Sequence, residues 1–441
     1  MVNTHKSLLI KNVRLADTVS RAQTQRDILI KDGVIADIMP YADDGSVYER
    51  TDGIDVYNAG GRYAVPSFVD MHVHLRDPGF EYKEDIITGT KAALAGGFCA
   101  VVSMPNTRPA CDSAEIVEMI KTKAQSKGSC FVLPAAAVTK GQSGAELCDY
   151  DELSEAGAYA FSDDGYPVSD PSVMRAAMKQ LAEKDRLLIT HAEELALTKT
   201  GVINEGRVSK LMGVAGIPNA SEDVATARDI VLAEEFGCRL HIAHVSTRGS
   251  VALIRDAKRR GVRVTAETCP HYFSLRDDDV VFYGVNAKMK PPLRSQRDVE
   301  AIIEGLADGT IDCISTDHAP HSKKDKGTSI ADGAFGIIGL QTAFCAAYTY
   351  LVLPGYIDMY RLVELMSINP ARIIGADTPE IGAGIPEVGK RAVITILDID
   401  TDYVFEEKSI VSKSKNTPYI GMTFVGKIDS VVNGTLHHFM K

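Results

Sequence analysis

The sequence predicts a (β/α)₈ barrel of the TIM type together with a small β-sandwich domain built from the N- and C-terminal segments. Between residues 66 and 379, eight short apolar runs alternate with longer stretches of helical spacing, as expected of a parallel barrel. Residues 1–65 and 380–441 contain short alternating segments and turn signals that are typical of β-structure. Metal-ligand residue types follow several of the apolar runs, which predicts a site at one end of the barrel.

The composition suits a globular enzyme of this size. The 441 residues are 45% hydrophobic and 24% charged, which excludes a largely disordered chain. The formal net charge of −11 argues against nucleic acid or an anionic membrane as the main partner. It leaves room for a local basic pocket that holds a small anionic substrate.

Cysteine usage and the N-terminus point to the cytoplasm. The eight cysteines are scattered and form no CxxC pair, which favours reduced thiols over a disulfide framework. The first ten residues lack the apolar core of a signal peptide, and no run of about 18 apolar residues occurs. We therefore expect a cytoplasmic protein without a membrane span.

The two ends of the chain have the same β pattern. At the N-terminus we expect strands at 7–10, 27–30 and 34–38, with a hairpin turn at Lys31, Asp32 and Gly33. At the C-terminus we expect strands at 392–397, 421–425 and 430–434. The pattern alone allows either one joint domain or two separate β caps.

The barrel strands and helices follow in order along the middle of the chain. The eight expected strands are residues 68–71, 100–104, 131–134, 158–161, 187–190, 239–243, 262–266 and 313–316. Helices are expected between them, for example at 114–126, 172–183, 222–236 and 250–259. Right-handed crossovers would place every carboxyl strand end at one mouth.

Histidines and aspartates follow five of these runs. They are His72 and His74 after the first run, Asp163 and Asp164 after the fourth, His191 after the fifth, His244 after the sixth and Asp317 after the eighth. Side chains repeat every two residues along a strand, so His72 and His74 would point to the same side. Taken singly, His191 and His244 also fit core histidines, and Asp317 fits a helix cap. Because all of them follow strands that end at one mouth, their conjunction predicts a metal centre.

The number of candidate ligands exceeds the demand of one catalytic zinc ion. Such an ion takes three protein ligands and keeps one position open. Four histidines and two aspartates fit two metals, with either Asp163 or Asp164 as the bridge. Water held by such a pair becomes a nucleophile at neutral pH, and Asp317 is suited to pass its proton to a leaving nitrogen. This chemistry hydrolyses amides, cyclic amides, ureas and some esters.

Six segments resemble the amidohydrolase superfamily and, within it, the class I dihydroorotases. They are residues 70–79 (DMHVHLRDPG), 104–107 (MPNT), 161–165 (FSDDG), 241–246 (HIAHVS), 316–321 (TDHAPH) and 369–372 (NPAR). Hydantoinase-like relatives place a carboxylated lysine on strand four, whereas residues 158–165 contain no lysine. The resemblance spans nearly the whole chain and favours a joint domain of residues 1–65 and 380–441 beside a barrel at 66–379.

The resemblance implies a role for each matched residue. His72, His74 and Asp317 resemble ligands of one Zn²⁺, His191 and His244 resemble ligands of a second Zn²⁺, and Asp164 resembles the bridge, giving two zinc ions per subunit. Arg76 and Asn106 resemble the pair that holds the substrate carboxylate, although Arg76 also fits a structural salt bridge. His321 and Gly336 resemble further substrate contacts, and residues 321–333 resemble a mobile active-site loop, with a plain solvated loop as the alternative.

Two positions depart from the family pattern. Lys290 stands before Pro291 where an asparagine that contacts substrate is common, and Ser67 stands where a glycine is usual. A lysine is a point charge rather than a donor–acceptor amide, so Lys290 bears on substrate identity.

The leading function implied is the reversible cyclisation of N-carbamoyl-L-aspartate to L-dihydroorotate in pyrimidine synthesis. The alternatives are a related cyclic ureide hydrolase, such as an allantoinase or hydantoinase, and an inactive scaffold barrel for a transcarbamoylase. The expected partners are a small-molecule substrate, a second copy in a homodimer, and aspartate transcarbamoylase.

Overall fold

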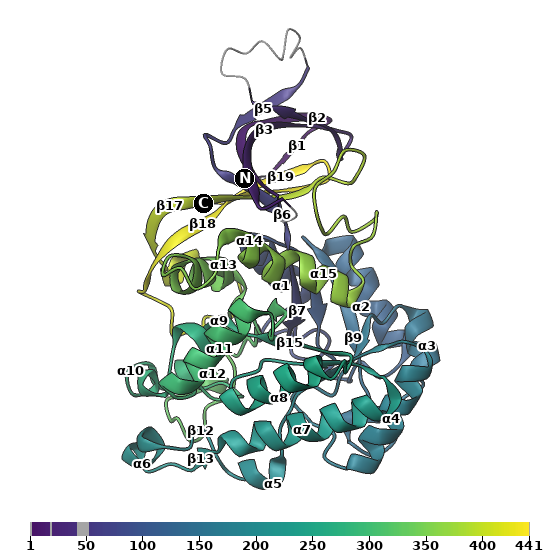
Figure 1. The fold of residues 1–441 in the computed structure, drawn as a ribbon, viewed down its shortest axis with the longest axis vertical. Helices are drawn as coiled ribbons and strands as arrows, with labels where there is room; N and C mark the ends of the chain where they lie inside the picture. The colour runs from purple at the N-terminus through teal and green to yellow at the C-terminus, as the bar shows by residue number, and fades with distance from the viewer. Residues whose placement is uncertain (1, 18–19, 42–52, 441) are drawn as a thin grey trace.

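The computed structural model describes the whole chain except residues 1, 18–19, 42–52 and 441. A β/α barrel fills the lower part of the molecule, and a separate sheet from both chain ends lies above it (Figure 1). Within the described residues, no helix combines the length and the apolar character needed to cross a membrane.

Eight parallel strands form the barrel, in sequence order around the sheet. They are β7 (Phe68–Val73), β8 (Phe98–Ser103), β9 (Phe131–Ala136), β10 (Ala160–Phe161), β11 (Leu187–Thr190), β14 (Arg239–Ile242), β15 (Val264–Thr268) and β16 (Cys313–Ile314). A parallel bridge between Val73 and His318 connects the first strand to the segment after the last, so the barrel closes. The predicted barrel is therefore confirmed.

The longer helices cover the outside of the barrel, and short helices lie in its connecting loops (Figure 1). They are α1 (Ile86–Ala95), α2 (Ala114–Lys127), α3 (Tyr150–Ala156), α4 (Pro171–Glu183), α5 (Leu195–Thr198), α6 (Arg207–Met212), α7 (Asn219–Phe236), α8 (Arg248–Arg259), α9 (Pro270–Ser274), α10 (Val280–Tyr283), α11 (Gln296–Asp308), α12 (Lys323–Lys326), α13 (Ala343–Ala347), α14 (Met359–Val363) and α15 (Asn369–Ile374). Short 3₁₀ turns and two π-helical turns, Tyr348–Val352 and Glu364–Ile368, complete the helical segments. Polar side chains fix several helix starts; for example, Asp85 accepts a hydrogen bond from the Thr88 amide at α1.

Alternate strand residues pack on opposite sides of the barrel wall. Val69 and Met71 of β7 belong to the interior cluster, whereas Phe68 and Val73 pack in the layer between strands and helices. The pairing of β7 with β8 is irregular between Asp70 and Val73, where β7 has one residue more than its partner. Such a bulge re-aims the side chains within and after it, and His72, which lies in the bulge, faces Asp164.

The terminal sheet is continuous and contains strands from both ends of the chain. Its strands are β1 (Val2–Thr4), β2 (Ser7–Asp17), β3 (Ala22–Lys31), β4 (Val34–Pro40), β5 (Asp55–Asn58), β6 (Tyr63–Pro66), β17 (Val393–Val404), β18 (Thr423–Asn433) and β19 (Leu436–Phe439). Antiparallel pairing of β6 with β17 joins the two ends, which resolves the alternatives in favour of one joint unit. The purple N-terminal strands curve over the yellow C-terminal strands (Figure 1), and Leu8, Ile28 and Ile394 share their core.

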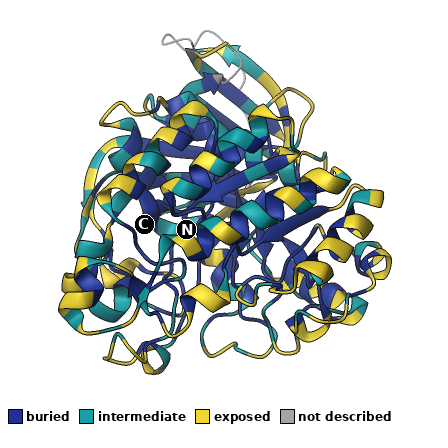
Figure 2. Cartoon of the chain, turned by 60° about the horizontal axis from the view of Figure 1, so that its bottom comes forward, coloured by how far each residue is buried: buried dark blue, intermediate teal, exposed yellow. Residues whose placement is uncertain are grey.

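The predicted hairpin turn is present between β3 and β4, where Asp32 and Gly33 both have positive φ. One difference concerns the C-terminus: residues 421–425 and 430–434, expected as two strands, lie largely in the single strand β18. A small parallel pair, β12 (Ile203–Asn204) and β13 (Gly216–Ile217), lies outside both sheets. Buried residues concentrate on the strands and on the inner faces of the helices, while exposed residues line the outer faces (Figure 2).

Candidate metal centre

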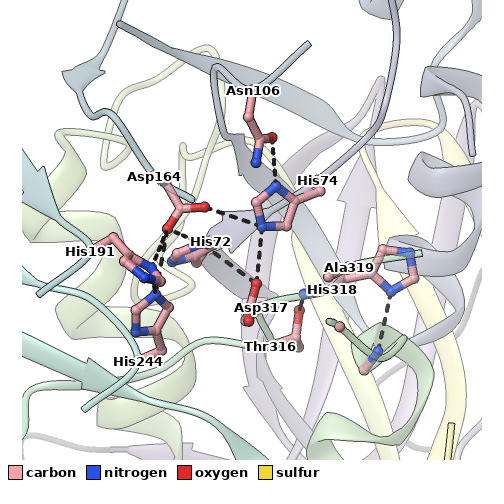
Figure 3. A network of polar contacts seen from close by, with 12 residues as sticks. His72, His74, Asn106, Asp164, His191, His244, Thr316, Asp317, His318 and Ala319 are labelled. Carbon is pink, nitrogen blue, oxygen red and sulfur yellow. Dashed lines mark hydrogen bonds and ion pairs between the residues drawn. The ribbon is translucent and has the colours of Figure 1, made fainter. Parts of the chain in front are cut away.

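Asp164 lies at the centre of the carboxyl end of the barrel, just after β10. Its Oδ2 is 3.4 Å from His74 Nε2, and its Oδ1 is 3.3 Å from His72 Nε2. The same Oδ1 lies 3.4 Å from His191 Nδ1 and 3.4 Å from His244 Nε2. Figure 3 shows the carboxylate between the two groups of imidazoles.

These side chains form two ligand triads that share one carboxylate. His72, His74 and Asp164 make the first triad, and Asp164, His191 and His244 make the second; within each, the ligand atoms lie within 4.8 Å of one another. Asp317 joins the first triad, with Oδ1 3.0 Å from His74 Nε2. The structure thus brings together all six residues predicted as ligands.

Asp163, the other candidate for the bridge, has its carboxylate engaged elsewhere. Its Oδ1 accepts hydrogen bonds from the amides of Val138 (2.8 Å) and Thr139 (3.2 Å), and its Oδ2 accepts one from the Thr139 hydroxyl. Burial raises the pKa of Asp163 to about 6 despite these bonds. Geometry therefore separates two adjacent aspartates that the sequence pattern could not rank.

The arrangement of buried atoms fits metal ions. His72 Nε2 and Asp164 Oδ1 are buried and face each other, yet neither has a hydrogen-bond partner among the residues that the structure describes. Buried polar groups left without partners are costly, and a cation between nitrogen and carboxylate ligands would satisfy both. Burial opposes ionisation of Asp164, but the neighbouring histidines, His72 first, hold the pKa of that carboxyl well below its usual value.

Acceptors on the outer side fix the orientation of three histidine rings. His72 Nδ1 lies 2.8 Å from Glu267 Oε1, His74 Nδ1 lies 2.8 Å from Asn106 Oδ1, and His191 Nε2 lies 3.1 Å from Glu193 Oε2. An acceptor at one ring nitrogen holds the proton there and leaves the other nitrogen as a lone-pair ligand.

The backbone around the centre is constrained. Arg76, His244 and Asp317 all have positive φ (59°, 36° and 45°), which is uncommon for residues other than glycine. Asp70 holds this region together because its carboxylate accepts bonds from the amides of His72 and Thr316 and from the Thr316 hydroxyl. Asp70 thereby ties β7 to the segment that carries Asp317.

The triads form the floor of a cavity of about 290 Å³. Every predicted site residue lines this cavity except His72, which is fully buried, and the alternative bridge Asp163. Arg76, Asn106, His321 and Gly336 lie on its walls. The structure therefore places the candidate substrate contacts next to the candidate ligands.

Arg76 makes no salt bridge within the described part of the chain. Its Nε donates to the Pro320 carbonyl (3.2 Å), and its Nη2 lies 3.2 Å from His321 Nε2. Asn106 uses its Oδ1 to accept from His74, so its amide NH₂ is the group left to act as a donor. Two donor side chains thus converge beside the centre.

Gly336 supplies shape rather than a free backbone group. Its φ is 129°, and an added Cβ would lie 2.6 Å from the Ala319 Cβ. Its N–H donates to the Lys288 carbonyl (3.0 Å), and its carbonyl accepts from Lys326 Nζ and Asn416 Nδ2 (both 3.0 Å). Both backbone polar groups of Gly336 are therefore already hydrogen-bonded, and the residue contributes to the cavity wall through its lack of a side chain.

Lys290 contacts an acid that sequence reasoning missed. Its Nζ lies 3.0 Å from Glu193 Oε1 and 5.4 Å from the centre of the Phe335 ring. Burial alone would raise the pKa of Glu193, but His191 and Lys290 lower it to about 2. Glu193 follows His191 by two residues at the same strand end, and that spacing was the available signal.

The loop predicted at residues 321–333 has ordered contacts. Ser322 caps the start of helix α12, where its hydroxyl accepts from the Asp325 amide, and Lys326 Nζ donates to three carbonyls: Lys288, Ala334 and Gly336. Its mobility stays a prediction.

Comparison with known proteins gives a consistent result. A family profile described as Dihydro-orotase-like matches residues 61–250. A dihydroorotase of Acetivibrio thermocellus is 46% identical over 430 residues, covering 97% of this chain and 98% of the relative. A dihydroorotase of Thermoanaerobacter sp. is 47% identical over 432 residues, covering 98% and 97%. An L-hydantoinase from Arthrobacter aurescens superimposes with a TM-score of 0.84 at 25% identity, covering 98% of this chain and 95% of that one.

Proposed function

This chain belongs to the dihydroorotase family, and from that premise we propose that its cavity interconverts N-carbamoyl-L-aspartate and L-dihydroorotate at a centre of two zinc ions, as in class I members. The enzyme is a cyclic amide hydrolase, and this reaction is a step of pyrimidine synthesis. The observation that carries the proposal is the position of Asp164, between two histidine groups and beside Arg76 and Asn106.

The donor set supports zinc at this centre. Imidazole and carboxylate are zinc ligands, and the two triads provide three ligands each through a shared carboxylate. His72, His74 and Asp317 would hold the first ion, His191 and His244 the second, and Asp164 both. When bound, two such ions polarise a carbonyl and lower the pKa of water.

The chain's own residues supply positioning and proton transfer. Arg76 and the Asn106 amide bind the substrate carboxylate, and His321 borders the same space. In the hydrolytic direction, Asp317 takes a proton from the attacking water while the water oxygen bonds to the ring carbonyl carbon. The amide C–N bond then breaks, and Asp317 returns the proton to the leaving nitrogen. Cyclisation is the reverse sequence.

Lys290 contributes a donor at the cavity wall, and among the described residues its ion-pair partner is Glu193 alone. Its ammonium lies beside Glu193 and the Phe335 ring, and Lys290, Phe335 and Gly336 all line the cavity. We assign it to contact a substrate oxygen in place of the more common asparagine.

Several broader features belong to the same proposal. We divide the chain into a terminal domain (1–65 and 380–441) and a barrel (66–379), which the pairing of β6 with β17 supports. The eight cysteines are free thiols in the structure, which supports a cytoplasmic location. A homodimer and an association with aspartate transcarbamoylase remain predictions.

A turnover assay with metal analysis tests the function. Purified enzyme is expected to open dihydroorotate and to leave allantoin and hydantoin essentially unchanged. The His74→Ala variant should lose activity and bind less zinc. Preferential turnover of allantoin, or full activity in His74→Ala, would contradict the proposal.

A further inference from the structure

The His321 ring lies between two cationic side chains. Its Nε2 is 3.2 Å from Arg76 Nη2, and its Nδ1 is 3.4 Å from Lys83 Nζ. A guanidinium and an ammonium can only donate hydrogen bonds. Both ring nitrogens of His321 therefore face a donor.

One imidazole cannot satisfy both neighbours. Burial, followed by Arg76 and Lys83, lowers the pKa of His321 to about 2, so the ring is neutral and carries a single N–H. One ring nitrogen accepts a hydrogen bond from its cationic neighbour, whereas the other carries the N–H and points it at the second cation. Either Arg76 or Lys83 can therefore donate to the ring, but not both.

The Lys83 amine needs a hydrogen-bond acceptor: burial, followed by Arg76, lowers the pKa of Lys83, whereas Asp325 favours the charged form. Its Nζ lies 5.2 Å from the centre of the Phe80 ring and 5.6 Å from that of Tyr82, and Asp325 Oδ2 is 4.0 Å away. Within the described residues, His321 Nδ1 is the only hydrogen-bond acceptor that Nζ contacts. Arg76, in contrast, also donates to the Pro320 carbonyl.

We propose that Lys83 is a positioning residue that donates to Nδ1 of His321 and thereby places the ring proton on Nε2, where it serves the substrate carboxylate. The substrate-free site then holds two donors, Arg76 Nη2 and His321 Nε2–H, facing each other at 3.2 Å. A carboxylate oxygen received between them accepts from both, and the Asn106 amide adds a third donor. The inference rests on the proposed function for the identity of that carboxylate.

The opposite tautomer would weaken the site. With the proton on Nδ1, Nε2 would accept from Arg76, and the two groups would satisfy each other. A carboxylate would then have to break that bond and would gain no donor from His321. Lys83 therefore leaves the Arg76 and His321 donors without a mutual hydrogen bond until a carboxylate binds between them.

Nitrogen NMR of the substrate-free protein tests the tautomer directly. In histidine-labelled enzyme, with the His321 signal assigned by its loss in His321→Gln, the proton is expected on Nε2. Lys83→Met should move it to Nδ1, and Lys83→Arg should retain it on Nε2. A wild-type ring protonated on Nδ1 overturns the proposal, whether or not any variant folds.

Kinetics provide the second readout. Lys83→Met should raise KM for dihydroorotate about tenfold, the loss expected for one charge-assisted hydrogen bond, with kcat and zinc content near wild type. Lys83→Arg should restore most of the lost affinity. Lys91→Met, which removes an exposed lysine from α1, controls for the loss of charge and should leave KM unchanged.

An unchanged KM and tautomer in a folded Lys83→Met enzyme would overturn the positioning role. If the wild-type enzyme fails to turn over dihydroorotate, the proposed function fails, while the tautomer measured without substrate still decides the role of Lys83.

Discussion

Single residues decide how the centre is charged and which groups remain for a ligand. Asp163 and Asp164 are adjacent in sequence, yet the first is consumed by the backbone of residues 138–139 and the second faces four imidazoles. Asn106 is likewise oriented by His74, which takes its carbonyl oxygen and leaves its amide hydrogens as donors. Partner identity, rather than residue type, sets each role.

Arg76→Lys tests the carboxylate clamp. A lysine keeps the charge but loses the planar fork, so KM for dihydroorotate should rise about tenfold while zinc content stays unchanged. Steady-state kinetics with metal analysis of the same samples would measure both. An unchanged KM would count against a carboxylate bound at Arg76.

Glu193 and Lys290 should separate into two effects. Glu193→Gln removes the charged acceptor on His191, and its zinc affinity should fall roughly 10- to 100-fold. Lys290→Met should retain zinc and change KM only, since its Nζ contacts Glu193 rather than a candidate ligand. Competition with a zinc chelator measures the zinc affinity of each variant, and steady-state kinetics measure KM for dihydroorotate and N-carbamoyl-L-aspartate. Equal loss of zinc affinity in both variants would contradict distinct roles for Glu193 and Lys290.

At the scale of elements, the strand ends explain why the sequence predicts the site well. Parallel strands bring their carboxyl ends to one mouth, so the sequence alone predicts that His72, His191, His244 and Asp317 meet there. The residues that orient the candidate ligands are harder to predict from the sequence. Glu267 on β15 and Asp70 on β7 lie within the strands, and nothing in the local sequence marks them as partners of the histidines. Their roles depend on cross-strand contacts that only the closed barrel creates.

The C-terminal strands show where local signals mislead. Gly426 lies between the two expected strands at 421–425 and 430–434, whereas β18 continues through it with φ of 83° and an irregular pairing with β17. A side chain there would lie 3.1 Å from the Tyr348 ring. The glycine is thus required by packing within a strand, not by a turn.

Helix α12 is fastened by Lys326, which is 3% exposed. Lys326→Met would leave three carbonyls without their shared donor and should destabilise the protein by about 2 kcal/mol. Burial, with a contribution from Lys288, lowers the pKa of Lys326 to about 7 from 10.5. Between these two pKa values the unfolded chain binds more protons at Lys326 than the folded chain does, so the free energy of unfolding of the wild type increases with rising pH.

That gain should be missing in Lys326→Met. Denaturant unfolding at about pH 7 and about pH 9 should show the wild type gaining up to roughly 1.4 kcal/mol per pH unit relative to the variant. An identical pH dependence in both proteins would show that Lys326 is not buried as described.

At the scale of the whole molecule, the barrel and the terminal sheet have different roles. The barrel carries the candidate ligands and the cavity, whereas the terminal sheet ties residues 2–66 to residues 393–439. Eight buried strands with ligand residues at their ends are strong signals, so the barrel was predictable in outline. Short strands such as β1, β5 and β19 were not, because their pairing comes from partners far along the chain.

The most direct test of the account is to remove and restore the metal. Dialysis against a chelator should abolish dihydroorotate turnover, and titration with Zn²⁺ should restore it, reaching full activity near two zinc ions per chain in the wild type and failing in Asp164→Ala. Full turnover by protein shown to be metal-free would contradict a metal centre in this barrel.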